Sequence, residues 1–183
     1  DNGSQAVILA AGTVNGASSI TTSGAISQTG ALVVTGTSSF SSTGTDTNID
    51  LSNAANNFGG TVTLNTTGTT SGDVSIDNDT NALTLTGTIN GSLTVLNGGT
   101  IADSATLRVT GTSSFTTDAT GANITLSSSD LEGAITLSTF ATSNFTLDNG
   151  TQAVILAGGT VNGALSVTSG GIISQTGGLT VTG

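Results

Sequence analysis

The amino-acid sequence predicts an all-β protein that folds as a parallel β-helix, or β-solenoid, running through residues 1–183 as one continuous unit. Three observations predict this fold: apolar and polar residues alternate in short segments, turn-forming residues separate these segments, and the sequence repeats itself. Alternation with a period of two is typical of strands with one buried face, and repeats of tens of residues are typical of solenoids.

The predicted strands are short segments in which two apolar residues flank one central residue. Val, Ile and Leu dominate the flanking positions, and Gly, Asn and Asp separate the segments, as expected for strands joined by tight turns. In order, the segments are 7–9, 32–34, 49–51, 62–64, 74–76, 83–85, 93–95, 107–109, 124–126, 135–137, 145–147, 154–156, 165–167 and 179–181. Further strands are predicted at Val14, Ile26, Phe40, Ile89, Ile101, Phe115 and Val161. No segment favours a helix.

The repeats divide the chain into modules. Residues 1–36 return at 148–183 with 27 of 36 positions identical, and VTGTSSF occurs at both 34–40 and 109–115. Asp77-Asn78 also matches Asp1-Asn2 and Asp148-Asn149. We therefore expect modules of about 71 to 76 residues, at roughly 1–76, 77–147 and, in part, 148–183.

Each module holds about nine predicted strands, so three strands per coil give a three-sided solenoid of about 24 residues per coil. Coils stacked about 4.8 Å apart pair every strand with the next coil and align the inward Leu, Val and Ile side chains. About seven to eight coils would make a rod on the order of 35 Å long. The alternative is a tandem array of small β-sandwich modules, which also uses short strands, but few aromatic residues are present to fill such cores.

Composition excludes most active-site chemistries. The chain has 27 Gly, 38 Thr and 24 Ser, but no Cys or His, and Arg108 is its one basic residue. A histidine general base, a thiolate nucleophile and a Schiff-base lysine are therefore excluded, and we expect no enzymatic activity and no catalytic residue. The net charge of −10 disfavours nucleic-acid binding. No run approaches the roughly 18 apolar residues of a membrane span, so we expect no direct membrane insertion.

Four acidic residues in Asp-Asn turns are candidate calcium ligands, because carboxylate and amide oxygens suit a hard cation. They are Asp1, Asp77, Asp79 and Asp148. The alternative is that Asp-Asn and Asn-Gly make tight turns. The Gly-Gly-x-Gly-x-Asp pattern of calcium-binding β-rolls does not occur here, which favours the turn interpretation, and no other cofactor is expected.

The central residues of the predicted strands should face solvent, and nine of the fourteen are Thr or Ser. A flat Thr-rich face could match the lattice of ice or bind a glycan. The alternative is that Thr combines strand preference with solubility. Ile8, Val33 and Ile155 are apolar residues at such outward positions, and they are candidate surface contacts unless a local twist buries them.

Four longer segments resemble the tandem repeats of large bacterial exoproteins of the filamentous-haemagglutinin and autotransporter-passenger type. They are ISQTGALVVTGTSSF at 26–40, NIDLSNAANNFGGTVTL at 48–64, NALTLTGTINGSLTV at 81–95 and GGIISQTGGLTVTG at 170–183. The resemblance covers essentially the whole chain. It implies a slice of a right-handed parallel β-helix that is exported and displayed as a long stalk, with the secretion-signal domain, any anchor and any receptor-binding tip outside this chain.

We therefore expect a structural stalk or fibre segment at the bacterial cell surface or in the extracellular medium, a stiff spacer for adhesion or filament building. Its expected partners are other copies, end to end or side by side, because unpaired strand edges at the ends of a solenoid slice favour association. A host-cell or glycan receptor would be bound by parts outside this chain. The alternative function is a binding module whose Thr-rich face engages ice, a glycan or another copy of itself.

Overall fold

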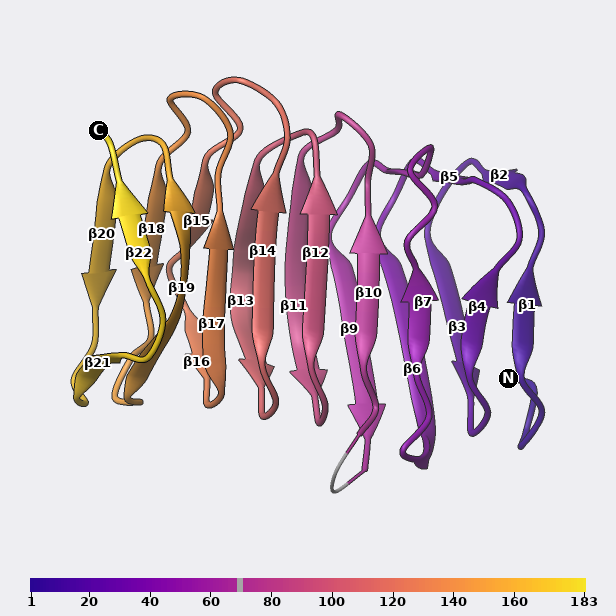
Figure 1. Ribbon diagram of the computed structural model, residues 1–183. Helices are drawn as coiled ribbons and strands as arrows, with labels where there is room; N and C mark the ends of the chain where they lie inside the picture. The colour runs from indigo at the N-terminus through magenta and orange to yellow at the C-terminus, as the bar shows by residue number, and fades with distance from the viewer. Residues whose placement is uncertain (69–70) are drawn as a thin grey trace.

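The computed structural model describes residues 1–68 and 71–183, and these residues form a β-solenoid of parallel strands (Figure 1). The coils follow one another along a single axis, with the N-terminus at one end and the C-terminus at the other. The described residues contain strands and turns but no helix, as the alternating sequence predicts.

The strand bounds are as follows. The first half of the structure contains β1 (Val7–Leu9), β2 (Gly12–Val14), β3 (Ser18–Thr22), β4 (Ile26–Gln28), β5 (Leu32–Val34), β6 (Ser38–Thr45), β7 (Ile49–Leu51), β8 (Asn57–Phe58), β9 (Val62–Thr67), β10 (Val74–Asp77) and β11 (Leu83–Ile89). The second half contains β12 (Leu93–Asn97), β13 (Ile101–Val109), β14 (Ser113–Thr117), β15 (Ile124–Leu126), β16 (Ser129–Leu131), β17 (Ala134–Ser138), β18 (Phe145–Asp148), β19 (Val154–Val161), β20 (Leu165–Thr168), β21 (Ile173–Gln175) and β22 (Leu179–Val181).

Over the part of the chain that the structure describes, the strands form a ten-stranded, a nine-stranded and a three-stranded sheet. The ten-stranded sheet has the order β1-β4-β7-β10-β12-β14-β17-β19-β21, with β22 also on β19. The nine-stranded sheet has the order β3-β6-β9-β11-β13-β15-β18-β20, with β16 also on β13, and the three-stranded sheet has the order β2-β5-β8. Strands pair in parallel with strands of the next coil, which confirms the predicted β-solenoid against tandem β-sandwiches.

The coils differ in length from the prediction. Paired residues in the ten-stranded sheet lie 19 to 25 positions apart, as with Val7 and Ile26 or Ile49 and Val74. The described residues therefore form nine coils rather than seven or eight coils of about 24 residues. The shortest coils span 19 residues, and the first of them, from Val7 to Ile26, still contains three separate strands, β1, β2 and β3. In β11, the pairing register with β13 shifts between Leu85 and Gly87.

Each of the first three coils adds one strand to each of the three sheets, as a three-sided cross-section predicts. From the fourth coil onward, the described strands belong to the other two sheets, but long strands there pair with two strands each: β13 pairs with both β15 and β16, and β19 pairs with both β21 and β22.

The alternating pattern fixes which side chains form the core. In β7, Ile49 and Leu51 are buried while Asp50 between them is exposed. Phe40 packs edge-on against Phe58 with ring centroids 5.8 Å apart, and a second pair of buried Phe rings lies 6.4 Å apart farther along the axis. Each such fully buried side chain contributes about 1.5–3 kcal/mol relative to an exposed one. The core is thin in section but continuous along the axis.

Stacking also restricts one corner of the coil to glycine. Gly159 has a φ of +128°, and a Cβ built on it would lie 1.8 Å from the carbonyl oxygen of Leu137 in the preceding coil. A residue with a side chain cannot adopt this backbone or this approach without a shift of the neighbouring coil.

Candidate functional site

The three Asp-Asn turns share one geometry. The Oδ1 atoms of Asp1, Asp77 and Asp148 each accept a hydrogen bond from the backbone N–H two residues later, at 2.8, 2.8 and 2.9 Å. The acceptor residue is followed by Asn, and the donor residue has a positive φ between 55° and 59° in every copy. The aspartates therefore stabilise turns in which the backbone is left-handed, as the turn interpretation of these residues predicts.

Among the calcium candidates, the structure brings Asp77 and Asp79 together and adds Asp118, which the sequence did not single out. Together with Ala54, Thr80 and Gly98, these three acidic residues line a hollow of about 110 Å³. Asp1 and Asp148 lie in other turns. Over residues 1–68 and 71–183, no group of three or more Asp, Glu, His or Cys side chains is placed to hold a metal ion. Calcium binding, the interpretation that the sequence favours less, stays a hypothesis.

Burial raises the pKa of Asp77 above its ordinary value of 3.8, and the charges of Asp118 and Asp79 raise it further. Backbone N–H groups of Asp79 and Asn78 hydrogen-bond the carboxylate and lower the pKa of Asp77, but the net shift is upward. The carboxyl group at the centre of this acidic group is therefore easier to protonate than an exposed aspartate.

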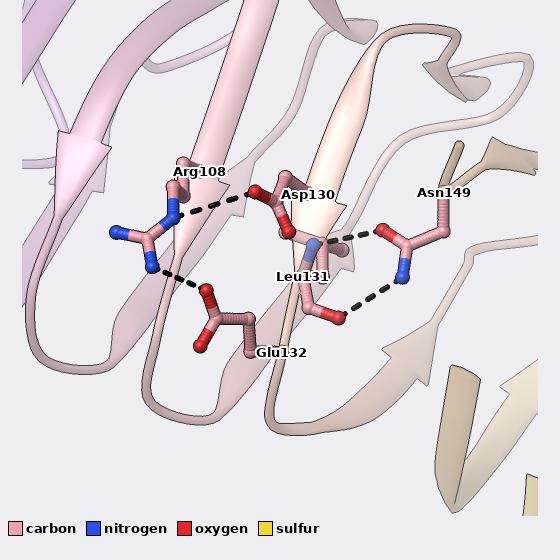
Figure 2. Close-up of polar contacts among 5 residues, drawn as sticks. All are labelled: Arg108, Asp130, Leu131, Glu132 and Asn149. Carbon is pink, nitrogen blue, oxygen red and sulfur yellow. Dashed lines mark hydrogen bonds and ion pairs between the residues drawn. The ribbon is translucent and has the colours of Figure 1, made fainter. Parts of the chain in front are cut away.

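The asparagine of each turn joins two coils. The side-chain amide of Asn149 accepts a hydrogen bond from the N–H of Leu131 at 2.8 Å and donates to the C=O of the same residue at 3.0 Å (Figure 2). Asn78 does the same with Phe58, at 2.5 and 3.3 Å. Both asparagines are fully buried. An amide that pairs with both backbone groups of one residue takes the place of a neighbouring strand, and we name this arrangement the asparagine clamp.

The clamp explains how the three-stranded sheet ends. Asn78 satisfies the backbone of Phe58 in β8, the last strand of that sheet, so these polar groups are paired without a fourth strand. Each clamp also donates a hydrogen bond to the C=O four residues later, from Asn78 to Ala82 and from Asn149 to Ala153, both at 3.0 Å. The amide therefore fixes its own turn and the neighbouring coil at once.

Sequence reasoning missed the role of these asparagines. It assigned the Asp and Asn oxygens of these turns to cation binding, or assigned the residues to turn formation alone. The repetition of Asn directly after Asp in all three copies, at Asn2, Asn78 and Asn149, is the pattern that could have identified the clamp.

Arg108 in β13 forms two ion pairs across the coils. Its Nε lies 3.3 Å from Asp130 Oδ2, and its Nη2 pairs with Glu132 (Figure 2). Arg108 and Asp130 are also register partners in β13 and β16. Both acidic partners and Arg108 itself are about a quarter to two-fifths exposed, so this group links surface strands rather than forming a reaction centre.

Outward hydroxyl groups line up on the ten-stranded sheet. Ser114 in β14 pairs in register with Thr136 in β17, and Thr116 pairs with Ser138. The file of Ser114 and Thr136 continues through Thr94 to Ser75. The file of Thr116 and Ser138 continues to Thr160 and Thr180 in one direction and ends at Leu96 of β12 in the other. The outward Thr and Ser residues thus form two files over four coils each, which overlap at β14 and β17, and not one file along the whole rod.

The three apolar surface candidates lie in two different coil environments. Ile8 in β1 is 66% exposed, whereas the repeat-equivalent Ile155 in β19 and Val33 in β5 are half-buried. Ile155 lies between Ala134 and Ser174 of the two adjacent coils, but Ile8 has a neighbouring strand on one side alone within the described structure. The alternation therefore places all three side chains outward, and the stacking of coils covers two of them in part.

Comparison with known proteins identifies the repeats. A family model described as repeats of unknown function (DUF5649) matches residues 1–65, 71–138 and 142–183. No curated protein and no solved structure matches the chain. Three successive matches confirm the tandem repeats expected from the sequence. Where the structure describes the chain, it contains no helix with the length and apolar character needed to cross a membrane.

Proposed function

We propose that this chain, which belongs to the family of repeats of unknown function, is a structural spacer. In this proposal it forms a stiff segment of a bacterial cell-surface or secreted fibre of the filamentous-haemagglutinin or autotransporter-passenger type. The spacer holds other parts of a longer protein at a distance from the surface, for adhesion or for building an extracellular filament.

The observation that supports the proposal most is the unbroken stack. The ten-stranded sheet passes through nine coils of the described residues, from β1 to β21, and the buried aliphatic core follows it. Each coil adds about 4.8 Å, so the first and ninth coils lie on the order of 38 Å apart along the axis. Every inner coil is hydrogen-bonded to two neighbours, which gives the segment a defined length and resists bending.

The composition and the repeat resemblance support an extracellular location. The segments at 26–40 and 170–183 resemble repeats of exported bacterial exoproteins. The chain also has no Cys and no Met, the two residues that oxidise most easily, and it offers trypsin-like proteases one basic residue, Arg108. These properties suit a protein that persists outside the cell.

Immunogold electron microscopy of the source cells tests the spacer function. An antibody raised against residues 1–183 should label regular rows along filaments that leave the cell surface. Gold particles on dispersed material in the medium, with bare filaments or none, would contradict the proposal. Pre-absorption of the antibody with the purified chain provides the control for specific labelling.

One observation favours a second candidate function, a binding module that engages ice, a glycan or another copy of the chain. Ser114 and Thr136, with Thr116 and Ser138, place two files of hydroxyl groups in register on adjacent coils. Ice-recrystallisation and glycan-binding assays on the isolated chain test this candidate. Loss of binding in Thr116→Val, with no loss in Thr146→Val on the nine-stranded sheet, would support it.

A further inference from the structure

Two junctions between coils inside the rod differ from the others. Over the described residues, each of the strands β1 to β19 pairs with a strand of the following coil, except β8 and β16. These two strands pair with the preceding coil alone, β8 with β5 and β16 with β13. On their other side, the asparagine clamp of Asn78 or Asn149 takes the place of the missing strand.

The two clamps lie at opposite edges of the rod. Asn78 begins the turn that follows β10 of the ten-stranded sheet, and Asn149 begins the turn that follows β18 of the nine-stranded sheet. The strands of these two sheets run in opposite directions, so the turn after β10 lies at the upper edge in Figure 1 and the turn after β18 lies at the lower edge. A movement that opens one clamp therefore separates the coils at one edge and leaves the other edge closed.

Two N–H groups at the second junction show how a clamp differs from a strand ladder. The N–H of Ile124 donates to the backbone C=O of Asn144 at 2.9 Å, and the N–H of Leu131 donates to the side chain of Asn149 at 2.8 Å (Figure 2). The first bond belongs to the pairing of β15 with β18, so neighbouring residue pairs must separate with it. The second bond is lost when one side chain rotates about its two torsion angles.

The first junction shows the same contrast. Ile49 donates its N–H to the backbone C=O of Asp73 at 2.9 Å, whereas Phe58 donates its N–H to the side chain of Asn78. At both junctions the donor residues are fully buried, so burial does not distinguish the clamp from the ladder. The difference between the two kinds of link is the number of groups that must move to break them.

The turns that carry the clamps face solvent. The two residues directly after Asn78 are exposed, and so are the two residues directly after Asn149. In each turn, the N–H three residues after the asparagine donates to the asparagine C=O at 3.1 Å. A turn closed by its own hydrogen bond can move outward as a unit, and no strand has to unpair.

We propose that the two clamps are the release points of the solenoid. The junction after β8 opens first at Asn78 and the junction after β16 opens first at Asn149, while the ladders of the ten-stranded and nine-stranded sheets stay paired. Each opening frees one edge of the rod, so the rod flexes at two fixed positions and in two opposite directions. The inference deepens the proposed spacer function, and its meaning in the cell rests on that function.

Hydrogen exchange of the full chain, followed residue by residue by NMR, tests the release points. After correction for intrinsic rates, the N–H of Leu131 should exchange at least ten times faster than that of Ile124 across the same junction. The N–H of Phe58 should likewise exchange at least ten times faster than that of Ile49. Equal rates within either pair would overturn the proposal, because the clamp would then hold its junction as firmly as a strand does.

The two clamps are controls for each other. Asn149→Ala should speed exchange at Leu131 at least tenfold further and change the rate at Phe58 less than twofold, and Asn78→Ala should do the reverse. Equal acceleration at Leu131, Phe58, Ile124 and Ile49 in either variant would contradict local release, because the whole solenoid would then open together. Immunogold labelling of filaments is independent of these rates, so failure of this proposal is distinguishable from failure of the spacer function.

Discussion

At the scale of single residues, the two repeat copies offer matched positions. Gly159 and Gly12 are the same repeat residue, but a Cβ on Gly159 would lie 1.8 Å from Leu137 O, whereas a Cβ on Gly12 meets no atom within 4 Å. Gly159→Ala should therefore lower the free energy of unfolding by about 2–5 kcal/mol, from backbone strain and displacement of the neighbouring coil. Gly12→Ala should change it by about 0.5 kcal/mol or less. Urea unfolding followed by circular dichroism measures both, and equal losses would contradict the stacking of these coils.

Asp77 should make stability depend on pH. Burial raises the pKa of Asp77 in the folded chain above 3.8, so the folded chain binds more protons than the unfolded chain in the window above 3.8. The contribution of Asp77 to the free energy of unfolding therefore rises as pH falls from neutral through the folded-state pKa, and stops rising below 3.8. Asp77→Asn should increase stability at pH 7, and its advantage over the unchanged chain should shrink toward pH 4.

The control for this prediction is Asp148→Asn, at the exposed equivalent position of the same turn. Its effect at pH 7 should be smaller, because the Asp148 side chain is exposed. Urea unfolding at both pH values compares the three chains. An advantage of Asp77→Asn that does not depend on pH would contradict the desolvation of this carboxyl group.

At the scale of elements, the asparagine clamp should contribute measurably to stability. Asn149→Ala leaves the buried N–H and C=O of Leu131 without their partner, so it should cost about 2–4 kcal/mol. Asn2→Ala removes bonds within the turn alone and should cost about 0.5–1.5 kcal/mol. The difference between the free energies of unfolding of the two variants, measured in urea, gives the contribution of the contact between coils. Equal free energies of unfolding would show that this contact adds no stability.

The strands could be predicted from the sequence because alternation is a local property. Ile49-Asp50-Leu51 has its two apolar residues buried and its acid exposed, as its pattern requires. Coil length could not be predicted as well, because it depends on which corners need a loop. Gly87 in β11 shows this dependence, because the pairing register with β13 shifts beside it and a Cβ on it would lie 2.1 Å from the carbonyl oxygen of Leu64 in the preceding coil. The asparagine clamp was missed because it also depends on the neighbouring coil: the partner of Asn149 lies 18 residues away in the sequence.

At the scale of the whole molecule, stacking should protect the one site that trypsin can recognise. Arg108 lies within β13, hydrogen-bonded between strands of the two adjacent coils and paired with Asp130 and Glu132. Cleavage needs an extended, unpaired segment, so the folded chain should resist trypsin and yield two fragments when it is unfolded in urea. Thr120→Arg, in an exposed turn between β14 and β15, should be cut in the folded state and serves as the positive control. Rapid cleavage at Arg108 in the folded chain would show that the central coils open readily.

The parallel stack has a mechanical consequence. The hydrogen bonds between coils run along the rod axis, so a force that pulls the two ends apart loads the coils in series. A coil that leaves the stack frees 19 to 25 residues, on the order of 65–85 Å of extended chain, in place of the roughly 4.8 Å that it occupied. Under tension the rod would hold its length up to a threshold and then lengthen in steps of one coil. Each step dissipates mechanical work. The segment that sets a fixed distance at rest therefore also limits the peak force on its two ends when it is stretched.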